Sequence, residues 1–304
     1  YINRSFLRNM IRTRAIIKNL SYDHLVKEGI IPDLVSLISQ SPTVMANKRY
    51  PPFVYRTKEY AFMGILMDYI IRAGLRINLQ QKVELGVDPV AEIIPSLAEL
   101  DIVEAVSSIT LYETSHNIND IAKSSFELAK ILTGGTNYNY SDIQGYIPVI
   151  VNIIKDTIAK WQYFGPYLNG NIHFNTEYSY GCFAGHPDIV INSHLHSAVL
   201  DIKNTASFPK MSKESSLQVL AYYALMKPTV PALQYVGFVL PMQREVAIYN
   251  VGPWDSTRYL HLLNAEGEKL ATQNPTRVAD IPYEEVDINN LNRQFAGLGH
   301  GGIT

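Results

Sequence analysis

The feature that most constrains this chain is a hairpin pattern in which two apolar segments, residues 189–191 and 198–200, flank the polar residues 192–194. Short apolar runs bounded by turn residues are typical of buried strands, and Asn-Ser-His is suitable for the turn. In a hairpin of this length, the start of the first strand lies beside the end of the second. The pattern therefore predicts that Asp188 and Asp201 lie side by side.

This carboxylate pair needs a partner, because close carboxylates repel each other and persist mainly beside a divalent cation or a shared proton. Lys203 points to the same strand face as Asp201, since alternate residues of a strand share a face. The side chain of Ile202 packs on the opposite face, which leaves its backbone carbonyl as a neutral ligand. We therefore predict a metal site at Asp188, Asp201 and the Ile202 carbonyl. Lys203 is placed to orient a water or a phosphate oxygen.

At these residues the chain resembles the PD-(D/E)XK nuclease superfamily. A Pro-Asp pair ends at Asp188 and opens the first strand, and the D-x-K triplet 201–203 closes the second. Gln218 and Tyr222 are similar to the Q-x-x-x-Y helix motif of the RecB-like branch, which includes CRISPR-associated exonucleases and the versions in giant DNA viruses such as mimivirus. A D-x-K triplet alone is common, whereas the three motifs in this order are a more specific pattern.

The resemblance implies an α/β fold of the restriction-endonuclease type, with a mixed central sheet flanked by helices and a helical insertion. It also implies a metal-dependent DNA nuclease that acts as an exonuclease, an endonuclease or both, with Mg²⁺ or Mn²⁺ as its cofactor. The catalytic residues that it implies are Asp188, Asp201, Lys203, Gln218 and Tyr222. The last two are four residues apart and share one helix face, which in the family lies against the active site.

Two further acidic residues are candidates for the metal site. RecB-like nucleases open with a helix that holds G-x-x-x-H, whose histidine reaches the metal, and a helix expected at about 57–73 carries Gly64 and Asp68 at that spacing. Oxygen donors suit Mg²⁺ and Mn²⁺ better than imidazole does, so we expect Asp68 to be an extra ligand; the alternative is a surface aspartate. Glu177, near the end of a strand expected at 171–180, is interpreted as a paired surface residue.

Composition sets the class of protein. A chain of 304 residues with 47% hydrophobic and 18% charged residues is globular and long enough for a large core. The single Cys182 excludes internal disulfides and the four-cysteine iron–sulfur cluster of many CRISPR-associated relatives, and it fits a reducing compartment. No signal peptide or membrane-spanning apolar run is visible, so we expect no membrane partner and an intracellular location: cytoplasm, nucleus or, for a viral protein, host cytoplasm. The chain begins at Tyr1 rather than Met, so we expect a fragment of a longer product.

The expected organisation has five parts. These are an N-terminal helical and basic region at 1–56, the first helix of the nuclease core at 57–76, a helical insertion at 77–165, the nuclease core at 166–272 and a tail at 273–304. Helices are expected at 3–20, 22–40 (interrupted near Gly29), 93–112, 119–132, 141–163, 213–227 and 254–270, and further strands at 235–240 and 245–249.

A net charge of −2 means that any nucleic-acid contact must come from local clusters. The candidate DNA contacts are Arg4, Arg8, Arg12, Lys48, Arg49, Arg56, Lys58, His186, Lys210 and Lys213. The first three lie on one face of the helix expected at 3–20, where the alternative is a solvated face. The next four lie in a segment where basic and aromatic residues alternate, as in grooves for single-stranded DNA, although its Pro-Pro pair also fits a linker.

The expected partners are single- or double-stranded DNA, a separate helicase and a second copy of the chain in a homodimer. His194 and His196 form an H-x-H pair in the expected turn, which we interpret as solvated rather than as a zinc site. Two other functions stay open: a catalytically idle nucleic-acid-binding scaffold with a nuclease fold, and a metal-dependent hydrolase of small phosphorylated substrates.

Overall fold

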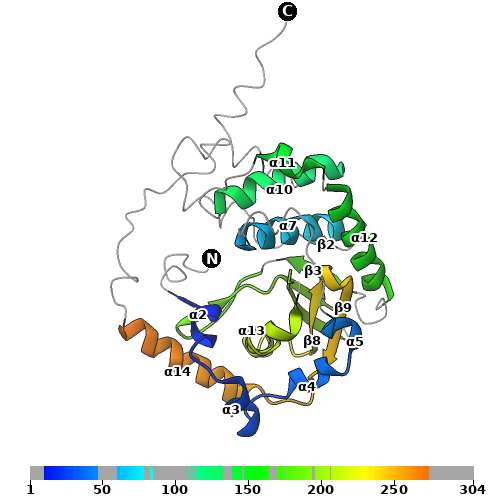
Figure 1. Ribbon diagram of the computed structural model, residues 1–304. Helices are drawn as coiled ribbons and strands as arrows, with labels where there is room; N and C mark the ends of the chain where they lie inside the picture. The colour runs from blue at the N-terminus through cyan, green and yellow to red at the C-terminus, as the bar shows by residue number, and fades with distance from the viewer. Residues whose placement is uncertain are drawn as a thin grey trace, which may run out of the picture.

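The computed structural model describes residues 10–46, 60–78, 83–84, 108, 111, 114–132, 139–145, 147–163, 170–174, 176–193, 196–205 and 207–273. Within these residues the protein is a mixed α/β structure with two mixed sheets, and helices cover both faces of the larger sheet (Figure 1). The expected mixed sheet flanked by helices is confirmed at this level. No helix in these ranges is long and apolar enough to cross a membrane.

The larger sheet contains six strands of the described chain, in the spatial order β2-β3-β6-β7-β8-β9. Their bounds are Val83–Glu84 for β2, Asn171–Phe174 for β3, Ile189–Asn192 for β6, Ser197–Ile202 for β7, Leu233–Leu240 for β8 and Glu245–Asn250 for β9. The β2–β3 and β7–β8 pairs are parallel, and the other neighbours are antiparallel. A parallel pair needs a crossover, which runs from β7 to β8 through the 3-10 helix η2 (Phe208–Met211) and helix α13 (Ser212–Met226).

The predicted hairpin is confirmed as the antiparallel β6–β7 pair. Ile189 lies opposite Leu200, and the same register extended by one residue places Asp188 beside Asp201. The apolar pattern fixes this register, because a shift by one residue would turn every buried side chain of the strand to the wrong face.

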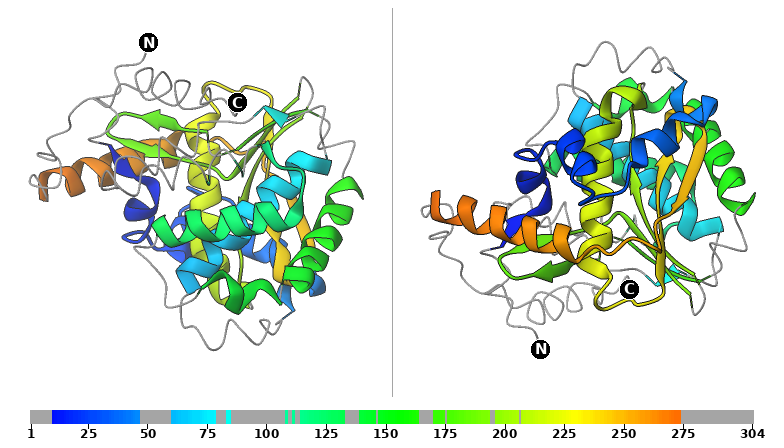
Figure 2. Two further views of the ribbon diagram at one scale, coloured as in Figure 1. Left: turned by 90° about the horizontal axis from the view of Figure 1, so that it is seen from above. Right: turned by 90° about the horizontal axis from the view of Figure 1, so that it is seen from below.

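Alternation along β6 and β7 divides their side chains between two cores. Ile189 and Leu200 pack in one core with helix α7, and Val190 and Val199 pack in the other with α13. Helix α7 (Tyr60–Asn78) is accompanied by α10 (Ile118–Leu132) and α12 (Ile147–Tyr163). Seen from below, α13 is flanked by α14 (Thr257–Gln273) and by the short N-terminal helices α2 (Thr13–Ile17) and α3 (Tyr22–Lys27) (Figure 2). Asp201 is two residues after Val199 on β7, so the two side chains share a face and Asp201 lies on the α13 side.

A smaller sheet joins the N-terminal segment to the strand that leads into the hairpin. Its order is β1 (Ile11–Arg12), β5 (Phe183–Gly185) and β4 (Tyr178–Tyr180), with β1 parallel to β5. The backbone N–H of Ile11 donates to the carbonyl of Cys182 at 3.0 Å. The Thr13 hydroxyl donates to the carbonyl of Ala184 at 2.8 Å. Two segments about 170 residues apart are thereby held side by side.

The helix expected at 3–20 is confirmed only at α2 (Thr13–Ile17) and is wrong at residues 11 and 12, which form a strand. Arg12 has an extended backbone and lies in β1, and the helix α2 begins only at Thr13. The physical reason is the pairing with β5, a long-range contact that outweighs the local helical periodicity. Arg4 and Arg8 lie outside the described residues, so the arginine stripe stays a prediction.

The remaining segments follow the expected pattern with two exceptions. The strand expected at 171–180 is two strands, because β3 pairs with β6 in the larger sheet whereas β4 pairs with β5 in the smaller one. The helix expected at 141–163 is also two: α11 (Tyr140–Gln144) and α12, separated around Gly145. The helices or strands expected at 22–40, 57–73, 119–132, 213–227, 235–240, 245–249 and 254–270 are found, with α3 and α4 (Leu34–Ser39) in the first range and the short helix α5 (Pro42–Met45) just after it. Most of the helix expected at 93–112 lies outside the described residues.

Two glycines provide a test of this packing with opposite expected signs. A Cβ atom at Gly237 would lie 2.3 Å from the carbonyl oxygen of Ala247, whereas one at Gly64 in α7 would meet no atom within 4 Å. We expect Gly237→Ala to lower the free energy of unfolding by about 1–3 kcal/mol through overpacking. Gly64→Ala should raise it by about 0.5–1 kcal/mol through helix propensity. Urea denaturation of both variants measures this, and equal shifts would contradict the placement of β8 against β9.

Candidate active site

Asp188 and Asp201 form the centre of the site, at the end of the β6–β7 hairpin. Asp201 is 1% exposed, and Asp188 immediately precedes β6. The Asp188 Oδ2 atom accepts a hydrogen bond from the backbone N–H of Ile202 at 2.6 Å, which ties the start of one strand to the end of the other. The structure thus brings the two aspartates together as the hairpin pattern predicts.

The protonation of Asp201 is strongly perturbed. Burial raises the pKa of its carboxyl group from 3.8 to about 8; the positive charge of Lys203 opposes the rise, and Asp188 adds to it through its charge and a hydrogen bond. The metal-free protein therefore favours the neutral acid at Asp201. A bound divalent cation would favour the carboxylate instead.

Lys203 connects the aspartates to helix α13. Its Nζ atom lies 2.6 Å from Asp201 Oδ2 and donates a hydrogen bond to Gln218 Oε1 at 2.9 Å. The Gln218 amide in turn donates to the Tyr222 hydroxyl at 2.7 Å. Burial, with added repulsion from Asp201 and Asp188, holds the pKa of Tyr222 well above its ordinary value, so it is a neutral phenol. The Q-x-x-x-Y pair therefore positions the lysine from one helix face, as its four-residue spacing predicts.

Asp68 reaches the site through an arginine that sequence reasoning missed. The Arg72 Nε atom donates to Asp68 Oδ1 at 2.9 Å, and its Nη2 atom contacts Asp68 Oδ2. The same Nη2 atom lies 3.5 Å from Asp188 Oδ1. The guanidinium thus lies between two of the carboxylates expected to bind metal. The four-residue spacing of Asp68 and Arg72 is a visible sequence signal, but the contact with Asp188 depends on the fold.

The donor set is suitable for a hard cation with few protein ligands. Across the described ranges, no three His, Cys, Asp or Glu side chains gather as a metal-binding group. Asp188 and Asp201 nevertheless supply two carboxylates, and Mg²⁺ is usually held by one or two carboxylates while it keeps several waters. Burial is the main cause of the raised pKa of Asp201, and a bound cation would offset that cost of ionisation, so the residues fit such a cation. Direct ligation by Asp68 stays a prediction, because Arg72 holds both of its oxygens.

Glu177 and His186 form a second pair of ionisable side chains, and His186 lies two residues before Asp188. The His186 Nε2 atom lies 2.8 Å from Glu177 Oε2, and their side chains are 13% and 25% exposed. The pairing expected for Glu177 is confirmed, with a partner from the Gly-His-Pro-Asp segment. His186, a candidate DNA contact, is fixed in place by it.

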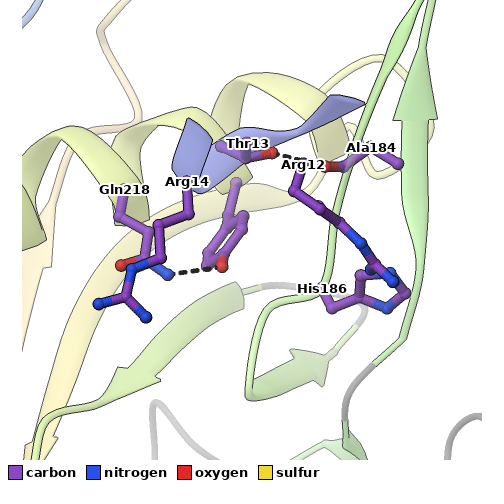
Figure 3. Close-up of a pocket in the computed structure, with 8 residues that line it drawn as sticks. Arg12, Thr13, Arg14, Ala184, His186 and Gln218 are labelled. Carbon is purple, nitrogen blue, oxygen red and sulfur yellow. Dashed lines mark hydrogen bonds between the residues drawn. The ribbon is translucent and has the colours of Figure 1, made fainter. Parts of the chain in front are cut away.

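A cavity of about 410 Å³ adjoins this centre (Figure 3). Its lining residues are Arg12, Thr13, Arg14, Ala184, Gly185, His186, Gln218 and Tyr222. Arg14 is missing from the sequence-based candidates because residue 14 falls off the arginine stripe of the helix expected at 3–20. Arg12 ends β1 and Arg14 lies in the first turn of α2, and both line the same cavity.

Gly185 is required where the cavity meets the active site. A Cβ atom there would lie 2.7 Å from the Thr13 hydroxyl oxygen and 2.8 Å from the Tyr222 ring. The missing side chain lets the N-terminal segment and α13 approach β5 from two directions. The glycine that precedes the Pro-Asp pair thus has a packing role.

The other predicted residues lie apart from the centre or outside the described ranges. Lys213 pairs with Asp23 at 2.6 Å on the surface, and Lys210 is exposed in η2. His196 contacts Gln234 at 3.4 Å near the opposite end of the hairpin. Outside the described residues lie His194 and the DNA-contact candidates Arg4, Arg8, Lys48, Arg49, Arg56 and Lys58.

A scan with protein-family models, a search of curated proteins and a search of solved structures each found no match to this chain.

The buried Asp201 provides a test that needs no assay of activity. Between about pH 4 and pH 8, the folded protein keeps a proton on Asp201 that the unfolded chain has already released. The stability of the metal-free protein should therefore fall as the pH rises through this window. Asp201→Asn removes this penalty. We expect the variant to be more stable than the parent by about 1–3 kcal/mol at pH 8, and by much less at pH 5.

Urea denaturation in EDTA at the two pH values measures this difference. The control is Asp23→Asn, which removes a surface carboxylate and should have a small effect that is the same at both pH values. A variant of Asp201 that is less stable than the parent at pH 8 would contradict the assignment of a destabilising buried carboxylate.

Proposed function

We propose that this protein is a metal-dependent DNA nuclease that hydrolyses phosphodiester bonds, with a core of the restriction-endonuclease type. The observation that carries the proposal is the buried Asp201 beside Asp188, with the Lys203 ammonium 2.6 Å from its carboxylate. These residues lie on adjacent strands in the order of the PD-(D/E)XK pattern, and the helix of the Q-x-x-x-Y motif packs against them.

The proposed metal ligands are Asp188, Asp201 and the backbone carbonyl of Ile202. A Mg²⁺ or Mn²⁺ ion held there lowers the pKa of a bound water and stabilises negative charge on the scissile phosphate. The hydrogen bond from the Ile202 N–H to Asp188 keeps the Asp188 carboxyl group aligned with the end of β7.

Lys203 supplies a positive charge at a fixed position. The Gln218 side chain accepts a hydrogen bond from the Lys203 ammonium, and Asp201 contacts the same ammonium. A preorganised cation of this kind orients a water or stabilises charge that develops on a phosphate oxygen. Tyr222 holds Gln218 and acts as a positioning residue.

The charge cluster itself favours an active enzyme over an idle scaffold. Three carboxylates (Asp68, Asp188 and Asp201) and two cations (Arg72 and Lys203) meet in a largely buried place. Replacement of buried ion pairs by apolar residues is often neutral or stabilising, so such a cluster is poorly explained by folding alone. A buried carboxyl group with a strongly raised pKa beside charged partners, as at Asp201, is typical of functional sites.

The first test is cleavage of end-labelled DNA. We expect the parent to degrade linear DNA with Mg²⁺ or Mn²⁺ and not with EDTA. Asp201→Ala and Lys203→Ala should each lower the rate by at least about 10³-fold while the circular dichroism spectrum is retained, because each removes a group that acts on the phosphate. Lys123→Ala, which removes an exposed lysine from α10, is the matched control.

The substrates separate the competing functions. Single- and double-stranded DNA, each in linear and closed circular form, distinguish an exonuclease from an endonuclease. Hydrolysis of free nucleotides without cleavage of DNA would indicate a small-phosphate hydrolase. DNA binding without cleavage under any metal would indicate the idle scaffold, and equal cleavage by the parent and both site variants would overturn the site assignment.

Metal binding should also stabilise the folded protein. At a free Mn²⁺ concentration of ten times the dissociation constant, the expected gain in the free energy of unfolding is about 1.4 kcal/mol. Asp188→Asn and Asp201→Asn should abolish this gain, which thermal unfolding with and without metal measures. Asp68→Asn tests the predicted extra ligand: a reduced gain supports direct ligation, and an unchanged gain leaves Asp68 as the partner of Arg72.

A further inference from the structure

We propose that the cavity next to the aspartates binds a second phosphate group of the DNA strand, with Arg12 and Arg14 as its ligands. The inference rests on the proposed function for the identity of the strand. The cavity itself is defined by the structure. Arg12 is among the DNA contacts expected from the sequence, whereas Arg14 is not.

The backbone of the N-terminal segment determines where the two arginines lie. Thr13 is 1% exposed and is hydrogen-bonded to the carbonyl of Ala184. The residues on either side of it are exposed at the mouth of the cavity. Arg12 lies beside His186, and Arg14 lies beside Gln218 (Figure 3). The buried threonine therefore anchors a pair of guanidinium groups on opposite sides of one opening.

The charges of this cavity differ from those of the aspartate cluster. Within the part of the chain that the structure describes, Arg12 and Arg14 form no ion pair with a carboxylate, whereas Arg72 and Lys203 do. The positive charge of Arg14 extends to the Tyr222 hydroxyl, where it opposes the rise in the pKa of that group. The cavity is thus lined by two arginines whose charge no carboxylate of the described residues neutralises.

The chemistry of these side chains favours phosphate. Guanidinium groups offer parallel N–H donors that match two phosphate oxygens, and they are widely used for this recognition. The Gln218 amide and the Tyr222 hydroxyl add neutral polar groups to the lining.

The cavity and the active site share a wall. Gln218 and Tyr222 line the cavity, and the same Gln218 holds the Lys203 ammonium beside Asp201. A strand whose scissile phosphate lies at the aspartates would therefore have a neighbouring phosphate within reach of the arginines. Two occupied phosphate sites fix the line along which the strand runs, which one site alone does not.

The test is equilibrium binding of a fluorescein-labelled single-stranded oligonucleotide in EDTA, measured by fluorescence anisotropy over a salt series. The variants are Arg12→Gln, Arg14→Gln and Arg14→Lys, with Lys123→Gln on the distant helix α10 as the charge-matched control. We expect each glutamine variant to weaken binding by about 3- to 10-fold at 0.1 M salt and to lower the salt slope by about 0.7 to 1. Arg14→Lys should recover the slope but not the full affinity, and the control should behave as the parent.

A terminal phosphate and an internal phosphate are separated by the choice of oligonucleotide. Tighter binding of a 5′-phosphorylated strand than of its 5′-hydroxyl form, lost in Arg14→Gln, places a strand end in the cavity. Equal binding of both forms and of a closed circle, with the same loss in Arg14→Gln, places an internal phosphodiester there. Parental affinity and slope in both glutamine variants would overturn the inference.

Failure of the phosphate-cavity proposal is distinguishable from failure of the nuclease proposal. Weakened binding by the arginine variants of a protein that cleaves nothing would retain the phosphate cavity and reject the nuclease. Conversely, metal-dependent cleavage that requires Lys203, with an unchanged KM for DNA in Arg12→Gln and Arg14→Gln, would retain the nuclease and reject the cavity as a phosphate site. Thermal unfolding of each variant checks that these exposed substitutions leave the fold intact.

Discussion

The repulsion between Asp188 and Asp201 is the constraint around which the site is built. Pairing of β6 with β7 forces the two carboxyl groups together, and burial of Asp201 removes the water that would screen them. Two cations contact the pair from different elements, Lys203 from the end of β7 and Arg72 from α7. Elements from both faces of the larger sheet are therefore needed to keep one strand end stable.

The same strand end also organises the N-terminal segment. Gly185 is the last residue of β5, and its missing side chain leaves room for Thr13 and Tyr222 to approach it. A contact made for packing thus places Arg12 and Arg14 next to the helix that positions the lysine. The site depends on segments from residue 11 to residue 222, although the motifs that reveal it occupy fewer than forty residues.

Local patterns were sufficient for the parts of the site that local rules govern. Strand alternation predicted the hairpin and the separation of Asp201 from Ile202, and four-residue helical spacing predicted that Gln218 and Tyr222 share a face. Long-range pairing defeated the same reasoning at Arg12, where β5 converts a helical pattern into a strand. The contact of Arg72 with Asp188 joins residues 116 positions apart, and no spacing rule reaches that far.

Burial and charge together determine the protonation of Asp201. Burial is the main cause of its raised pKa, to which the charge of Asp188 adds and which the charge of Lys203 opposes. Arg72 contacts Asp188 from α7, whereas Lys203 is held by Asp201 and Gln218. The two cations thus reach the aspartates from opposite faces of the larger sheet, the guanidinium of Arg72 from α7 and the ammonium of Lys203 beside α13.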